Sequence, residues 1–154
     1  MDIFNSSEDI LEFAVNAEQK AYNLYTRLAV QSVNPQTQAL FEKFAVEVNR
    51  HKLKLAKFKL DKEIQVSDAA LKTIKKSTFD VVNEYSTDLK YLDALSLAIK
   101  REKAIYQLYN FLSEATENEE IKAQLQNFAT DAARHMVAFE LEYEIFEKSF
   151  FQTN

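Results

Sequence analysis

The chain has 154 residues, the size of one ordinary domain, and 47% of them are hydrophobic, so we expect a single domain over 1–154 with its own core. It has no cysteine, which excludes disulfides, thiolate zinc sites, iron–sulfur clusters and cysteine nucleophiles. Its formal net charge of -5 argues against nucleic-acid binding, which requires a basic face.

The first half of the chain is predicted to form two long helices. The sequence has no glycine and one proline, and its apolar residues recur at intervals of three and four, so nearly all of it should be helical. The first helix is expected to start at Ser6 or Ser7 and to run to about Gln31. Asn34 is a good N-cap and Pro35 suits the first helical position, which predicts a second helix from there to about residue 61.

The second half should contain two more long helices. A third is predicted over about 88–114, and Thr116 with Glu119 forms a possible capping box that opens a fourth helix, to about 148. The stretch 62–87 is too long for a tight connection, and its own apolar periodicity predicts one or two short helices. Short loops on either side of one long connection predict an all-α four-helix bundle, made of hairpins 7–61 and 88–148 joined by a crossover.

The two predicted hairpins are copies of one pattern. An offset of 84 residues aligns them over about 45 residues without a gap, which random helical sequences would rarely give. The matched pairs include Leu11 and Leu95, Ala14 and Ala98, Glu18 and Glu102, Tyr22 and Tyr106, Tyr25 and Tyr109, Leu28 and Leu112, Phe44 and Phe128, Arg50 and Arg134, and His51 and His135. The repeat therefore places the only two histidines of the chain at equivalent positions.

Four ionisable side chains fall on the predicted inward faces. At about 100° per residue, Glu18 and Glu102 interrupt otherwise apolar stripes on the first and third helices, and His51 and His135 lie on the inward seams of the second and fourth. Buried charges must be paired, because an isolated one costs many kcal/mol. Two arrangements meet that demand: the four groups hold a metal ion, or they form two Glu–His pairs.

In the arrangement without a metal, tyrosine hydroxyl groups would complete the hydrogen-bond network. The candidate tyrosines are Tyr22, Tyr25, Tyr106 and Tyr109.

The segments that carry these residues resemble a known family. AVNAEQKAYNLYTRLA and AIKREKAIYQLYNFLS are similar to the first and third helices of rubrerythrin-like members of the ferritin-like superfamily, and FAVEVNRHKL and FATDAARHMV to the second and fourth. That family holds a di-iron centre with one Glu on each of the first and third helices and a Glu-x-x-His motif on each of the others. The resemblance implies a ferritin-like fold with Glu18, His51, Glu102 and His135 as metal ligands.

The sequence departs from this pattern at both bridging positions. Val48 and Ala132 stand where the family has a glutamate three residues before each histidine. Glu47 and Asp131 lie one residue further back, about 100° away around the helix, and are predicted to form exposed pairs with Arg50 and Arg134.

The loss of the bridging glutamates bears on how many metal ions the site holds. Two adjacent divalent ions normally need several anions between and around them, whereas the two remaining glutamates supply only two. One iron or other divalent ion is therefore favoured over two, and a site without metal remains open.

Three functions are compatible with these residues. The first is a variant non-haem iron oxidoreductase that acts on peroxide or oxygen; it would need an external electron donor, because full-length rubrerythrins carry a cysteine-ligated iron that this sequence cannot bind. The second is a metal-free ferritin-like bundle that serves as a binding or scaffold protein. The third, iron storage, requires assembly of a shell.

The ends of the sequence predict location and assembly. The first residues, MDIFNSSEDI, lack the pattern of a signal peptide, and no segment approaches 18 apolar residues in a row, so we expect no membrane association and a cytoplasmic location. Aromatic residues of the last helix, Phe146, Phe150 and Phe151, are expected to pack against the crossover or a second subunit, and a homodimer is predicted.

Overall fold

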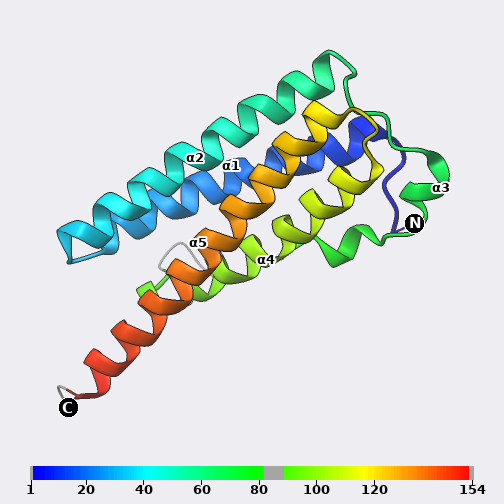
Figure 1. Cartoon of the computed structure of the whole chain (residues 1–154). Coiled ribbons are helices and arrows are strands. Elements are labelled where there is room, and N and C mark those ends of the chain that lie inside the picture. Colours follow the sequence, from blue (N-terminus) through cyan, green and yellow to red (C-terminus); the bar gives the residue numbers. More distant parts are fainter. Residues whose placement is uncertain (1, 82–88, 153–154) are drawn as a thin grey trace.

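A computed structural model describes residues 2–81 and 89–152, with side chains described up to residue 149. Over this part of the chain all regular elements are helices, and the predicted all-α fold is confirmed. The elements, labelled in Figure 1, are α1 (Ser7–Gln31), α2 (Pro35–Leu60), α3 (Asp68–Leu71), a short 3₁₀ helix η1 (Lys76–Thr78), α4 (Tyr91–Ala115) and α5 (Glu119–Gln152).

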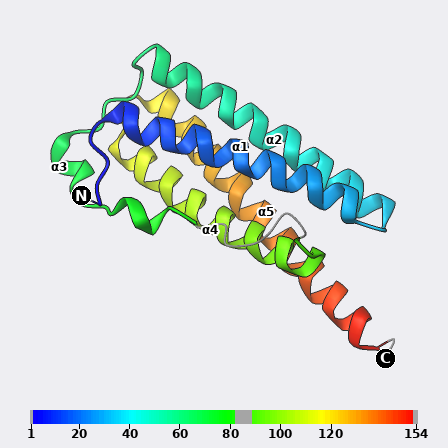
Figure 2. The same ribbon diagram turned by 180° about the vertical axis from the view of Figure 1, so that it is seen from behind.

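The long helices form a ferritin-like four-helix bundle. Helices α1 and α2 make one antiparallel hairpin and α4 and α5 the other (Figure 1). The chain leaves α2 at one end of the bundle, passes through α3 and η1, and enters α4 at the other end, so α4 runs antiparallel to α1 (Figure 2). In both views the last part of α5 extends beyond the other helices.

The first two long helices begin where capping residues predict. The Ser6 hydroxyl accepts a hydrogen bond from the backbone N–H of Asp9 at 3.0 Å, and the Asn34 side chain accepts one from Gln36 N–H at 2.8 Å. Each cap satisfies a backbone donor that has no partner within its helix. The predicted bounds of α1 and α2 agree with the structure to within one residue.

The predicted cap of α5 is wrong. Thr116 forms no capping box with Glu119, because its hydroxyl donates to Leu112 O at 2.6 Å and closes the end of α4. Asn118 caps α5 instead, since its side-chain oxygen accepts from Ile121 N–H at 3.1 Å. The helix also continues to Gln152, beyond the predicted end near 148.

Apolar side chains fill the bundle on both sides of a polar middle section. One cluster gathers around Phe58, Leu112 and the crossover residue Phe79, and the other around Phe41 and Phe139. The four ionisable side chains singled out above lie between these clusters.

Two predictions about the outside of the molecule can be compared with the structure. Phe146 of α5 packs against Tyr91 at the start of α4, with ring centroids 4.8 Å apart, whereas the side chains of Phe150 and Phe151 lie outside the described residues. Among the helices that the structure describes, none combines the length and apolar character needed to cross a membrane.

Candidate functional site

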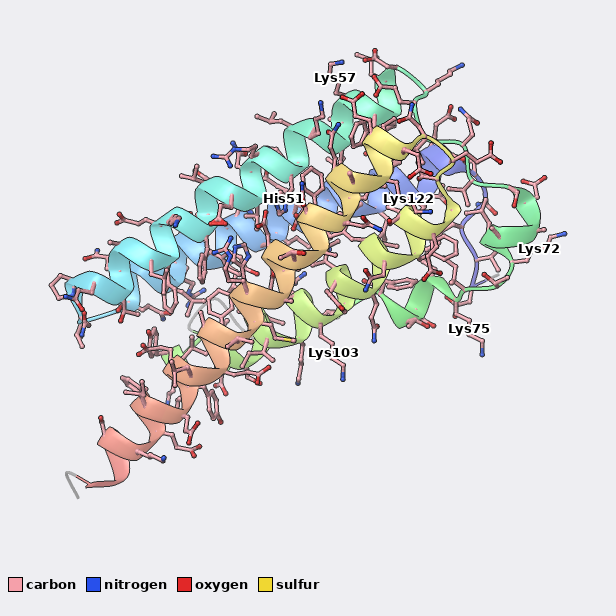
Figure 3. All side chains as sticks on the ribbon, in the orientation of Figure 1. His51, Lys57, Lys72, Lys75, Lys103 and Lys122 are labelled. Carbon is pink, nitrogen blue, oxygen red and sulfur yellow. The ribbon has the colours of Figure 1, made fainter. Side chains whose placement is uncertain are left out.

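The four predicted site residues come from the four long helices and are all buried. Glu18 on α1 and Glu102 on α4 are each 1% exposed, His51 on α2 is 3% exposed, and His135 on α5 is fully buried. Their predicted placement inside the bundle is therefore confirmed, while their role as metal ligands stays a prediction. Figure 3 shows His51 within the bundle, between α2 and the other long helices.

In the first half of the site, His51 lies between two carboxylates. Its Nδ1 is 2.8 Å from Glu18 Oε2 and its Nε2 is 2.8 Å from Asp131 Oδ2. Burial alone would lower the pKa of His51, but hydrogen bonds to Asp131 and Glu18 outweigh it and raise the pKa to about 9. The Tyr109 hydroxyl donates a further hydrogen bond to Glu18 Oε2 at 2.6 Å. Every polar atom of the imidazole therefore has a partner.

In the second half of the site, His135 also lies between two carboxylates, but its contacts with them are longer. His135 Nε2 is 3.3 Å from Glu47 Oε1, and His135 Nδ1 is 3.3 Å from Glu102 Oε2. The latter contact is close enough for an ion pair but lacks hydrogen-bond geometry, so His135 Nδ1 and Glu102 Oε2 are buried atoms without a hydrogen-bond partner. Burial and the nearby Glu18 raise the pKa of Glu102, against the opposing effects of His135 and of Tyr25, whose hydroxyl donates to Glu102 Oε1.

The prediction for Glu47 is wrong, and that for Asp131 holds in part. Glu47 is only 7% exposed and accepts from Arg134 of α5 instead of pairing with Arg50. Asp131 makes the predicted pair with Arg134, at 3.1 Å, but also reaches His51.

Helix geometry explains why Glu47 is buried and why Asp131 is only partly exposed. A residue four positions before a histidine lies about 40° from it around a helix, on nearly the same face. The matched four-residue spacing in both repeats was the sequence signal that could have revealed these acids.

Aromatic rings enclose the site. Phe128 stacks on His51 with ring centroids 4.2 Å apart, and Phe44 contacts His135 at the same distance. Of the four tyrosines predicted to complete the hydrogen-bond network, only Tyr25 and Tyr109 are buried. The other two, Tyr22 and Tyr106, are each 37% exposed, and the hydrogen bonds to Glu18 and Glu102 come from the buried pair.

These residues do not fit a pair of adjacent metal ions. Val48 and Ala132, 1% and 2% exposed, fill the positions of the bridging carboxylates with hydrocarbon. Glu47 and Asp131 raise the number of acids to four, but they contact the Nε2 side of the imidazoles, away from Glu18 and Glu102.

A single divalent ion fits the donor set in kind and charge. Two imidazole Nδ1 atoms face two glutamates, whose charges would balance the ion. As arranged in the structure, no three His, Asp or Glu side chains of the described residues surround a common point, so an ion would have to replace the direct Glu–His contacts.

Comparisons with known proteins agree with this fold. The sequence profile of the Rubrerythrin family matches residues 9–143. No curated protein matches the sequence.

Two solved structures have the same fold. One is a hypothetical protein from Pyrococcus furiosus, 22% identical, with a TM-score of 0.71 over 94% of this chain and 92% of that one. The other, from Thermotoga maritima and described as a candidate ferritin-like diiron-carboxylate protein, is 18% identical, with a TM-score of 0.73 over 94% and 98% of the two chains.

Proposed function

This chain belongs to the rubrerythrin family, and from that premise we propose that it binds one divalent metal ion with Glu18, His51, Glu102 and His135. With iron bound, it would act on peroxide or oxygen. The family supports metal binding in general, and the donor set of this chain favours one ion over two.

The orientation of the two imidazoles carries the proposal. Each ring directs Nδ1 toward a glutamate of the first or third long helix and Nε2 toward an acid of the opposite hairpin. Metal-binding histidines commonly donate their second N–H to a carboxylate, which fixes the ring and makes the other nitrogen a better ligand. Asp131 and Glu47 are in position to do this for His51 and His135, respectively.

The surrounding residues would support an ion without binding it. Arg134 donates to Glu47 and Asp131 and so offsets part of the negative charge of these outer acids. Tyr25 and Tyr109 donate to Glu102 and Glu18, and burial raises the pKa of both hydroxyls well above its usual value, so each tyrosine holds its proton.

Any turnover would depend on an electron source outside the chain. Bound iron would supply one-electron redox chemistry, and reduction of hydrogen peroxide to two water molecules consumes two electrons and two protons. The chain has no cysteine with which to hold a second iron centre of the rubredoxin type. We therefore expect an external electron donor.

Metal stoichiometry tests the proposal directly. Protein produced with iron and purified without chelator should contain one ion per chain by elemental analysis, and anomalous scattering should locate it beside Glu102 and His135. The variant His135→Gln should lose the ion, whereas Glu120→Gln, a change at an exposed acid at the start of α5, should keep it. Two ions per chain in the unaltered protein would overturn the single-ion site.

Restoring the bridging carboxylates provides a second test. The double variant Val48→Glu and Ala132→Glu returns the Glu-x-x-His spacing to both hairpins. We expect it to bind two ions per chain, because it adds the two anions that a pair of ions lacks. No gain in metal would contradict the view that these two aliphatic residues are what excludes the second ion.

A metal-free binding or scaffold protein is the second candidate function. One observation favours it: both nitrogens of His51 already have carboxylate partners at 2.8 Å, so this half of the site is satisfied without an ion. Iron-grown protein that contains no stoichiometric metal, and that does not bind added Fe²⁺, Mn²⁺ or Zn²⁺, would support this candidate and exclude the first.

A further inference from the structure

A two-part cavity leads from the surface to the buried glutamates. Its outer part, about 230 Å³, lies between α1, α4 and the crossover, and its walls include Phe13 and Phe79. Its inner part has about 20 Å³ of free space and reaches Glu18 and Glu102. Both parts share Arg101 as a lining residue. The inner part has room for about one water molecule, so any larger ligand must stay in the outer part.

Arg101 lies in the wall that both parts of the cavity share. It is half-buried, and among the described residues it makes no hydrogen bond or ion pair. Burial lowers the pKa of Arg101, against the opposing effects of Tyr25 and Asp80. The residue at the equivalent position of the first hairpin is Ala17, which lines the same cavity, so the arginine is a departure from the internal repeat. A half-buried guanidinium at a cavity wall, with Asp80 nearby but no carboxylate of the described residues bonded to it, is suited to bind an anion.

The charged and aromatic residues that line the outer part indicate which class of ligand it could bind. Lys20 and Lys76 join Arg101 around it and Asp80 opposes them, so the opening has an excess of positive charge. This excess favours the binding of anions in the outer part. The aromatic walls favour a ligand with an apolar body.

We propose that this outer cavity binds a small organic carboxylate, with its charged group on Arg101 and its apolar body against Phe13 and Phe79. Glu18 and Glu102, which line the inner part, would repel the carboxylate group and keep it at Arg101. The proposal does not depend on the metal site, since none of the three contact residues is a candidate ligand of the ion.

Binding of matched probes to the full chain, freed of metal with a chelator, tests this proposal. Calorimetry or ligand-observed NMR at low salt would compare benzoate with its neutral analogue benzamide and the cation benzylammonium. A charge-assisted hydrogen bond to a half-buried arginine should make benzoate bind roughly tenfold more tightly than benzamide. Benzylammonium should not bind measurably.

Two variants that each remove one positive charge from α4 distinguish binding at Arg101 from a general effect of net charge. Arg101→Met keeps an apolar side chain but removes the guanidinium, and should lower benzoate affinity roughly tenfold, to the level of benzamide. Lys103→Met removes one positive charge from an exposed residue of α4, labelled in Figure 3, that does not line the cavity, and should leave binding unchanged.

Chemical-shift mapping in the unaltered protein keeps the test independent of how the variants fold. Benzoate should shift the methyl signals of Val81, which lines both parts of the cavity, and leave those of the exposed Leu53 unchanged. Equal affinity for benzoate and benzamide, or an unaltered affinity in folded Arg101→Met, would overturn the proposal. Inorganic phosphate that displaces benzoate at equal concentration would also overturn it, because the apolar body would then contribute nothing.

Discussion

The two acids at Glu47 and Asp131 show how a displacement of one residue changes the chemistry of a helix face. Three residues before each histidine, a glutamate would sit beside the imidazole as a bridging ligand in this family. Four residues before it, each acid instead reaches across the bundle to the Nε2 atom of the opposite hairpin's histidine. Glu47 is thus kept in the core and Asp131 at its edge, and both are moved from the ligand side of the imidazole to its outer side.

Removal of one outer acid should weaken metal binding without changing the number of ions. We expect Glu47→Gln to lower metal affinity about 10-fold to 100-fold, the usual effect of losing a carboxylate that orients a histidine ligand. Competition with a chelator of known affinity would measure the change. Glu42→Gln, at an exposed position of the same helix, is the control and should bind as the unaltered protein does. Equal affinities of the two variants would argue that Glu47 does not orient His135.

The raised pKa of His51 predicts a pH dependence of stability in chelator-treated protein. The pKa of about 9 lies above the ordinary value of 6.5, so the native state holds this proton more tightly than the unfolded chain does. The stabilisation is fully present below pH 6.5 and is lost as pH rises through 9, by on the order of 3 kcal/mol. Urea unfolding between pH 6 and 10 would measure it. His51→Gln should remove this slope, and a flat profile in the unaltered protein would contradict the assignment.

At the scale of helices, sequence patterns predicted the fold well because the relevant signals are local. Capping residues and three-to-four periodicity fixed the starts of α1 and α2, and the repeat fixed which faces point inward. The cap of α5 was mistaken because two candidate residues lie close together, and only the structure shows that Thr116 is already used by α4. The cross-bundle contacts of Arg134 could not be predicted, since they depend on how two hairpins pack.

The corrected cap of α5 can be tested by mutation. Asn118→Ala removes the acceptor for Ile121 N–H and should lower the free energy of unfolding by about 1 kcal/mol, the typical cost of losing a side-chain N-cap. Denaturant unfolding would measure this change. Glu119→Ala, which would break a capping box with Thr116, should have little effect. A larger loss for Glu119→Ala than for Asn118→Ala would restore the original prediction.

At the scale of the whole molecule, the two hairpins are related by an internal repeat that is not exact. Glu18, His51 and Tyr109 lie beside the same kinds of residue as their counterparts, yet Arg134 donates to both outer acids, whereas within the described residues the equivalent Arg50 bonds to neither. The second half of the site is also the one with unpaired buried atoms. The halves are therefore chemically distinct, which supports placing a single ion nearer to Glu102 and His135 than to the other pair.

The predicted homodimer can be tested on the exposed surface of α5. Val137, Leu141 and Ile145 are 62%, 56% and 51% exposed and stand four residues apart, so they form one apolar stripe along the helix. Such a stripe suits the self-complementary interface of a twofold dimer. The double variant Leu141→Glu and Ile145→Lys should shift the protein from dimer to monomer in sedimentation velocity. Glu140→Gln, at an exposed neighbour outside the stripe, should leave the dimer intact. An unaltered protein that sediments as a monomer at all concentrations would refute the prediction.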